Sequence, residues 1–173
     1  MRKKIFAFLL LSALYAGAQE VPDWENPIVV GINKEPYHAT LTLPSQKADC
    51  KEIISLNGKW RFQWSADPGK RPADFYKNDF NTDTWDTIIV PGAWQLQGYG
   101  KPIYSNVNYP FQKDAPKVTS EPPAEYYSYG HRNPTGSYVT TFEVTLDMKD
   151  KCLYLHFEGV KSAMYVWVNG ERV

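Results

Sequence analysis

The chain of 173 residues lacks most of the motifs by which enzymes are identified from sequence. It has no Gly-x-Ser-x-Gly, no phosphate-binding glycine loop and no cysteine–histidine pairing pattern. Its three histidines, His38, His131 and His156, lack the spacing of metal ligands. The 19 basic and 19 acidic residues balance and form no basic stripe, so the sequence does not indicate a nucleic-acid partner.

Long apolar runs are also missing, except for one at the N-terminus. Basic residues 2–4 precede an apolar run at 5–15 and small residues at 16–18. This layout predicts a signal peptide over 1–18, cleaved before Gln19, and a periplasmic or secreted protein. The alternative, a membrane anchor, would need about 20 apolar residues. Cleavage would leave all the acidic residues but three fewer basic ones, which makes the mature chain mildly acidic.

Cysteine is scarce, with only Cys50 and Cys152. In an oxidising compartment the two could pair. The sequence does not show whether their Cα atoms come close enough for a bond, so pairing stays open.

Residues 19–51 are predicted to form an extended N-terminal arm. Four prolines, Pro22, Pro27, Pro36 and Pro44, interrupt any long helix there. A disordered leader is the alternative, but Trp24 and the apolar residues at 28–32 favour an arm that packs against a neighbouring domain.

Helical periodicity is absent from residues 52–173, where period-two patterns predict β-strands instead. In 56–64, Trp60, Phe62 and Trp64 fall on one face. Further strands are expected at 87–90, 137–146, 151–158 and 162–168, the last apolar on both faces. Short strands separated by turns predict an all-β sandwich or barrel.

Asn169-Gly170 predicts a type I′ hairpin turn, because both central residues need positive φ. Only three residues follow, and we expect so short a strand to leave its neighbour unpaired. The sequence therefore predicts a domain that is incomplete at its C-terminus, and residues 19–173 expressed alone are expected to aggregate or fold only partly.

Two groups of residues could carry chemistry. Five aspartates cluster between residues 67 and 86, but they stand in turn-like sequence, where aspartate caps and forms turns. The aromatic residues in loops, Trp94, Tyr99, Tyr104 and Tyr109, need either a partner surface or a ligand.

Several blocks of sequence together resemble the start of bacterial β-galactosidases of glycoside hydrolase family 2. The blocks span nearly all of the chain after residue 18, in the same order: Asp23-Trp24-Glu25-Asn26-Pro27, Leu56-Asn57-Gly58-Lys59-Trp60-Arg61-Phe62, Pro102-Ile103-Tyr104-Ser105-Asn106-Val107-Asn108-Tyr109-Pro110, Asn133-Pro134-Thr135-Gly136-Ser137-Tyr138 and Trp167-Val168-Asn169-Gly170. The resemblance implies a jelly-roll β-sandwich, the sugar-binding domain, over 52–173.

In that family the sugar-binding domain precedes two immunoglobulin-like domains that flank a (β/α)8 barrel. The barrel supplies two catalytic glutamates, and terminal β-galactose is released with retention of configuration. The resemblance thus implies that the chain is one domain of an exo-β-galactosidase whose catalytic barrel it lacks, so no catalytic residue is assigned. It also implies a homo-oligomer for the full-length protein.

By the same resemblance, Asn106 and Val107 match the loop that reaches the active-site pocket and contacts galactose. An amide can donate to and accept from vicinal hydroxyls without adding charge beside the catalytic carboxylates. The alternative is that Asn106 merely fixes its own turn.

Asp23, Asn26 and the backbone of Val29 match positions that hold a divalent cation in the family. The resemblance implies Mg²⁺ in the full-length protein and leaves Na⁺ open as a second ion. Oxygen ligands suit such ions. A capping role for Asp23 is the alternative.

One departure from the family leaves the substrate open, and a function other than catalysis is also open. Residues 118–132 form a longer loop than the compact family version, which leaves substrate preference open between β-galactosidase, β-glucuronidase and β-mannosidase. A non-catalytic carbohydrate-binding module is the rival from another class.

Overall fold

The computed structural model describes residues 22–36, 53–102, 124–125, 130, 133–161 and 163–173. In this part of the chain the elements are short strands and 3₁₀ helices: η1 (Asp23–Glu25), β1 (Gly58–Ser65), η3 (Pro68–Lys70), β2 (Asp86–Val90), η4 (Trp94–Gln97), β3 (Thr135–Val139), η6 (Leu146–Met148), β4 (Trp167–Val168) and β5 (Glu171–Arg172). The described residues contain no α-helix and none that could cross a membrane. The all-β prediction is confirmed for them.

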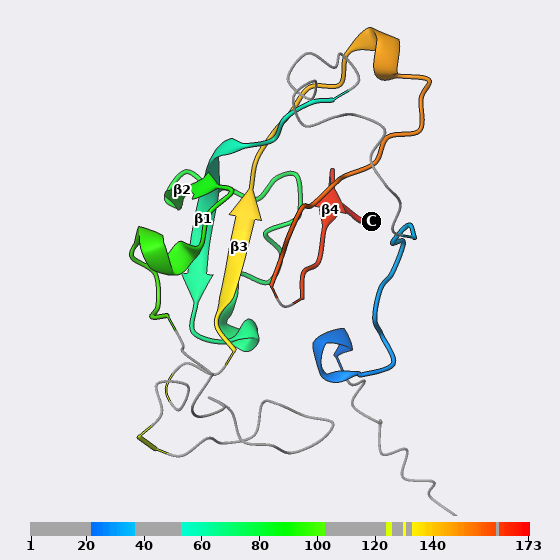
Figure 1. The fold of residues 1–173 in the computed structure, drawn as a ribbon. Coiled ribbons are helices and arrows are strands. Elements are labelled where there is room, and N and C mark those ends of the chain that lie inside the picture. Colours follow the sequence, from blue (N-terminus) through cyan, green and yellow to red (C-terminus); the bar gives the residue numbers. More distant parts are fainter. Residues whose placement is uncertain (1–21, 37–52, 103–123, 126–129, 131–132, 162) are drawn as a thin grey trace, which may run out of the picture.

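Strand β1 is the centre of a three-stranded antiparallel sheet with the order β2-β1-β3 (Figure 1). Phe62 stands opposite Asp86 on β2 and opposite Tyr138 on β3. The predicted alternation along β1 is confirmed, because Phe62 is buried and Trp60 half-buried while Lys59 and Arg61 are exposed. The strand therefore has one packed face, on which Phe62 is the central side chain.

The hairpin predicted at Asn169-Gly170 is present. Both residues have positive φ, 51° and 88°, as a type I′ turn requires. The expectation that the last strand would be too short to pair is wrong, because β5 pairs with β4 through Trp167↔Arg172 and Val168↔Glu171. A two-residue turn brings the flanking residues opposite each other at once, so even two residues per strand can form a ladder.

Three predicted strands are shorter than expected or absent. Strand β3 ends at Val139 rather than 146, residues 151–158 form no strand, and of the described residues 163–168 only Trp167–Val168 is a strand. A strand exists only where a neighbouring backbone accepts its hydrogen bonds, and a period-two pattern does not supply that neighbour.

These segments nevertheless keep large apolar side chains, and many of them are exposed. The exposed set in this region consists of Phe142, Val144, Leu146, Leu153, Tyr154, Leu155, Phe157, Val160 and Met164. The buried apolar residues of the described part are only Phe62, Trp85, Ile88 and Met148. Apolar surface on this scale is typical of a face that another layer covers, and it agrees with the expectation that the chain alone aggregates.

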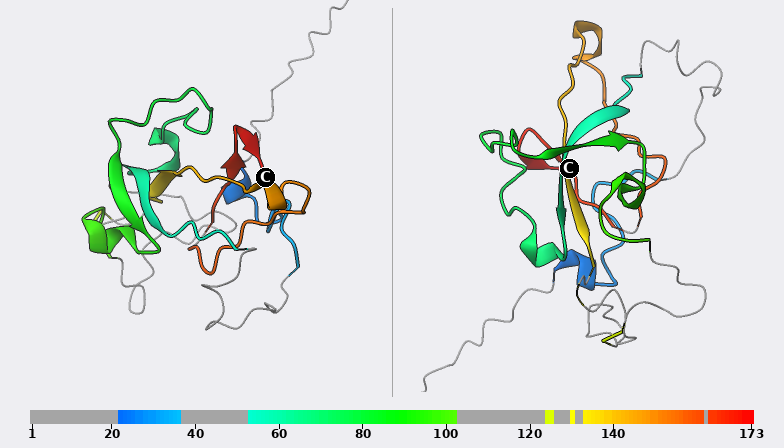
Figure 2. Two further views of the ribbon diagram at one scale, coloured as in Figure 1. Left: turned by 90° about the horizontal axis from the view of Figure 1, so that it is seen from above. Right: turned by 90° about the vertical axis from the view of Figure 1, so that its left-hand side faces the viewer.

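The hairpin β4–β5 lies between the sheet and the N-terminal arm (Figures 1 and 2). On the sheet side, the ring of Trp167 stacks on that of Tyr76 at 5.1 Å and 11°, and Phe75 meets it edge-on at 5.7 Å. Asn78 Nδ2 donates to the Asn169 carbonyl at 3.2 Å. These contacts attach the hairpin to the loop that follows η3.

Candidate functional site

The residues predicted to contact sugar, Asn106 and Val107, lie outside the described residues, as do Tyr104, Tyr109 and most of the 118–132 loop. The structure does describe the two places where the chain enters and leaves this region. The chain is described up to Pro102 and continuously again from Asn133 to Lys161. The described part of the candidate site is therefore the packing around these two ends.

The entry end is fixed by an aromatic cluster around Phe62. The Phe62 ring contacts Tyr99 and Tyr138, each at a centroid distance of 4.7 Å, and Trp94 at 6.1 Å. Such edge-on and tilted pairs add about 0.5–1.5 kcal/mol each to the burial of apolar area. The loop aromatics Trp94 and Tyr99 thus have a partner surface inside their own domain, which is one of the two alternatives that the sequence left open.

Gly98 turns the chain from η4 back to this cluster. It has a left-handed φ of 96°, and the backbone N–H of Tyr99 donates to the Trp94 carbonyl at 3.1 Å. A residue with a Cβ is strained in this conformation, whereas glycine is not. The Gly98-Tyr99 pair therefore closes η4 and directs Tyr99 onto Phe62.

Gln97 attaches η4 to the edge strand β2. The backbone N–H of Ile89 donates to Gln97 Oε1 at 2.8 Å, and Gln97 Nε2 donates to the Ile89 carbonyl at 3.0 Å. One side-chain amide thus satisfies both outward-facing backbone groups of an edge residue, as a neighbouring strand would. Sequence analysis did not identify this residue, because nothing in the sequence distinguishes Gln97 from any polar loop residue.

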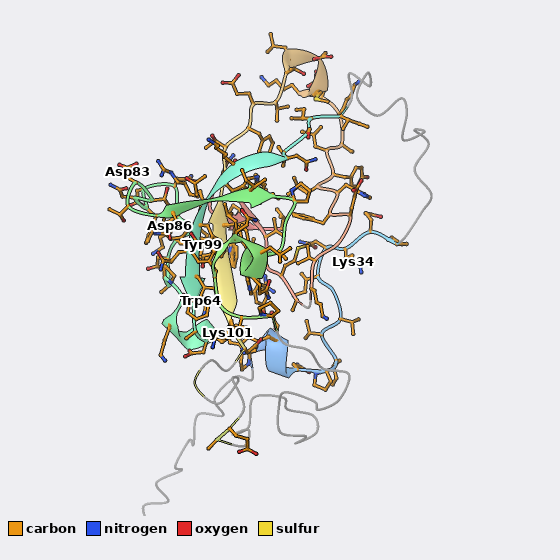
Figure 3. The ribbon with its side chains drawn as sticks, turned by 60° about the vertical axis from the view of Figure 1, so that its left-hand side comes forward. Lys34, Trp64, Asp83, Asp86, Tyr99 and Lys101 are labelled. Atoms are coloured by element: carbon orange, nitrogen blue, oxygen red, sulfur yellow. The ribbon has the colours of Figure 1, made fainter. Side chains whose placement is uncertain are left out.

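Tyr99 is also held by a hydrogen bond from its hydroxyl to Asp86 Oδ2 at 2.9 Å, and Figure 3 shows the two side chains side by side. Burial of the phenol, with the hydrogen bond to Asp86 and the charge of that carboxylate, raises the pKa of Tyr99 above its usual value near 10. The phenol is therefore neutral and a hydrogen-bond donor at physiological pH.

The exit end of the region is fixed at Gly136. A Cβ placed on Gly136 would lie 2.6 Å from Trp94 Cζ3 and 2.7 Å from Phe62 Cε2. The backbone of β3 therefore approaches the aromatic cluster so closely that only glycine fits. Because Trp94 precedes the region and Gly136 follows it, this contact joins its two ends.

Within the aspartate cluster, the capping role that the sequence predicted is confirmed for Asp67. Asp67 Oδ1 accepts from the Lys70 backbone N–H at 3.2 Å and caps η3, and Asp74 forms an ion pair with Lys77 at 3.1 Å. With Asp86 committed to Tyr99, three of the five have such local partners. Within the described residues no three histidine, cysteine, aspartate or glutamate side chains are grouped as metal ligands would be.

Asp23, predicted to hold a cation, forms an ion pair with the far end of the chain. Its Oδ2 lies 2.6 Å from Arg172 Nη2, and the Arg172 guanidinium lies over the Tyr165 ring at 4.6 Å. Trp24 meets the same ring edge-on at 6.0 Å. The described part of the arm, 22–36, therefore packs beside the hairpin of its own domain, whereas the sequence favoured packing against a neighbouring domain.

The two other predicted cation ligands do not complete a site in the described residues. Asn26 Oδ1 accepts from the Ile28 backbone N–H at 3.1 Å, and the Val29 N–H donates to the Asn26 carbonyl at 3.1 Å. The Asp23 and Asn26 side chains thus have protein partners, and the metal stays a prediction for the full-length protein.

Pairing of Cys50 with Cys152, which the sequence left open, is not tested, because Cys50 lies outside the described residues; Cys152 is exposed.

Comparison with known proteins places these features in a family. Residues 53–173 match the family model described as the sugar-binding domain of glycosyl hydrolases family 2. The chain is 40% identical over 168 residues to a β-galactosidase of Priestia megaterium (strain DSM 319 / IMG 1521), which covers 91% of this chain and 16% of that protein. It is 38% identical over 151 residues to a β-galactosidase of Halalkalibacterium halodurans, with 84% and 14% covered.

A β-galactosidase of Clostridium acetobutylicum is 40% identical over 158 residues, which cover 87% of this chain and 17% of that protein. The chain thus spans only 14–17% of the length of these three relatives.

The contact at Gly136 can be tested by adding a single methyl group. We expect Gly136→Ala to lower the free energy of unfolding by about 1–3 kcal/mol, because the methyl overpacks Trp94 and Phe62. Gly159→Ala is the matched control, since a Cβ there meets nothing within 4 Å. Denaturant unfolding of the full-length protein, followed by tryptophan fluorescence, measures both. Equal stabilities for the two variants would contradict the close approach.

Proposed function

We propose that this chain, which belongs to the family of sugar-binding domains of glycosyl hydrolases family 2, is the N-terminal domain of a retaining exo-β-galactosidase. The enzyme would remove terminal non-reducing β-D-galactose, and its catalytic groups would lie outside these 173 residues. The observation that carries the proposal is the 38–40% identity to three β-galactosidases over 84–91% of the chain.

In this proposal the domain is a complete jelly roll in the full-length protein. The apolar side chains of 142–164 would then face a second sheet, as the period-two pattern of 151–158 predicts. Their exposure in the described residues supports this arrangement. The domain would present the loop carrying Asn106 and Val107 to the substrate, and the Phe62 cluster with Gly136 would hold the two ends of that region.

The substrate assignment is tested on the full-length protein with nitrophenyl glycosides. We expect hydrolysis of the β-galactoside and little or none of the β-glucuronide and β-mannoside, which the alternative members of the family would prefer. Asn106→Ala should lower kcat/KM on the galactoside by about tenfold, the effect of losing a hydrogen bond or two to a bound sugar.

Asn57→Ala is the matched control, because Asn57 is exposed before β1, and it should leave the kinetics unchanged. Preference for another glycoside would reject galactosidase activity. Sugar binding with no hydrolysis of any of the three would favour the carbohydrate-binding module. Wild-type kinetics for Asn106→Ala would remove the role of that side chain.

Export is the second part of the proposal and rests on residues 1–18, which lie outside the described residues. N-terminal sequencing of the protein recovered from the periplasm or medium should begin at Gln19. A product that still begins at Met1 would show that the segment is not cleaved.

The third part of the proposal is that the full-length protein binds Mg²⁺ through Asp23, Asn26 and Val29. A cation there would share the Asp23 carboxylate with Arg172, which binds Oδ2, so the two positive groups would compete for its negative charge. We expect Mg²⁺ to raise the melting temperature of chelator-treated protein, and Arg172→Gln to enlarge that rise. Asp23→Asn should abolish it, so an unchanged response in Asp23→Asn would place any bound cation elsewhere.

A further inference from the structure

An open cleft of about 370 Å³ lies against the sheet. Lys59, Trp60 and Arg61 line it from β1, and by strand alternation the side chains of Lys59 and Arg61 point away from the face that carries Phe62. Thr87 on β2 stands directly opposite Arg61. Further threonines line the cleft from the loop before β2 and the end of β3: Thr82, Thr140 and Thr141.

The positive charge of this cleft is not balanced by its lining. The lining includes two cationic side chains and no carboxylate. Three other cations of the described residues form ion pairs with carboxylates: Lys70 with Asp67, Lys77 with Asp74 and Arg172 with Asp23. The nearest aspartates along the chain, Asp83 and Asp86, are not among the lining residues, and Asp86 accepts a hydrogen bond from Tyr99 on the Phe62 face.

Among the described residues, Arg61 uses one of its donors in a hydrogen bond that holds it in place. Its Nη1 donates to the Trp85 carbonyl at 3.3 Å, which fixes the guanidinium at the cleft. A guanidinium has five N–H donors in a rigid fork that matches the oxygens of a carboxylate or a sulfate. A fixed guanidinium beside a lysine therefore suits an oxyanion.

The remaining lining suits a sugar ring. Threonine hydroxyls donate to and accept from the hydroxyls of a sugar, and the volume lies in the range of about 300–1,000 Å³ that holds small ligands. We propose that this cleft binds a sugar unit that carries an oxyanion, such as a sulfate ester or the carboxylate of a uronic acid. The proposal goes beyond the hydrolysis of galactosides and does not depend on it.

Calorimetric titration of the full-length protein tests the ligand class. The probes are galactose 6-sulfate, galacturonate, neutral galactose and inorganic sulfate. The two charged sugars are titrated in the presence of enough galactose to saturate the hydrolytic site. We expect one or both charged sugars to bind at least about tenfold more tightly than inorganic sulfate, with affinity that falls as salt is added. Failure of both to bind, or binding of inorganic sulfate with equal affinity (an adventitious ion only), would overturn the proposal.

Variants then locate the binding. Arg61→Gln and Lys59→Gln should each weaken binding of the charged sugar by about tenfold, the effect of losing one charge-assisted contact. Lys77→Gln removes an exposed lysine outside the cleft and should bind as wild type. Nitrophenyl β-galactoside hydrolysis should be unchanged in all three. Undiminished binding in Arg61→Gln, or hydrolysis lost together with binding, would overturn the assignment to this cleft.

Discussion

The packing of one side chain, Phe62, is the constraint on which the rest of the described structure depends. Phe62 lies in the middle of the central strand and is fully buried. Full burial of a phenylalanine contributes about 1.5–3 kcal/mol, but here it also fixes geometry. To cover the ring, Trp94 and Tyr99 must fold back over the sheet, and β3 must approach so closely that position 136 has no room for a Cβ. Elements from three parts of the chain are thereby placed relative to one another.

The second organising contact ties the beginning of the described chain to its end. The ion pair between Asp23 and Arg172 joins residues 149 apart in sequence, and both side chains are partly exposed. Such a pair contributes only about 0–1 kcal/mol by itself. It is accompanied by the Trp24–Tyr165 contact and by Arg172 over the Tyr165 ring, so the position of the arm is set by aromatic packing together with charge.

The sequence predicted well the features that depend on neighbouring residues. The packed face of β1, the strand at 86–90 and the Asn169-Gly170 turn follow from alternation and from local φ preferences. It predicted poorly the extent of strands after Val139, because pairing depends on a partner that the pattern does not specify. Gln97, Gly136 and Arg172 could not be found this way, since each acts on a residue that lies elsewhere in the chain.

The sheet itself separates the two sugar contacts considered for this domain. Tyr99, from which the chain continues toward Asn106, packs on the Phe62 face of β1, whereas Arg61 points to the opposite face. Side chains of successive strand residues leave the sheet in opposite directions, so the Arg61 side chain and the Phe62 ring that Tyr99 covers lie on opposite faces. The cleft would therefore add affinity for charged sugar units without entering the chemistry of galactoside cleavage. In this proposal, a preference for substituted glycans would come from the outer face of the sheet, independently of the galactose contact proposed for Asn106.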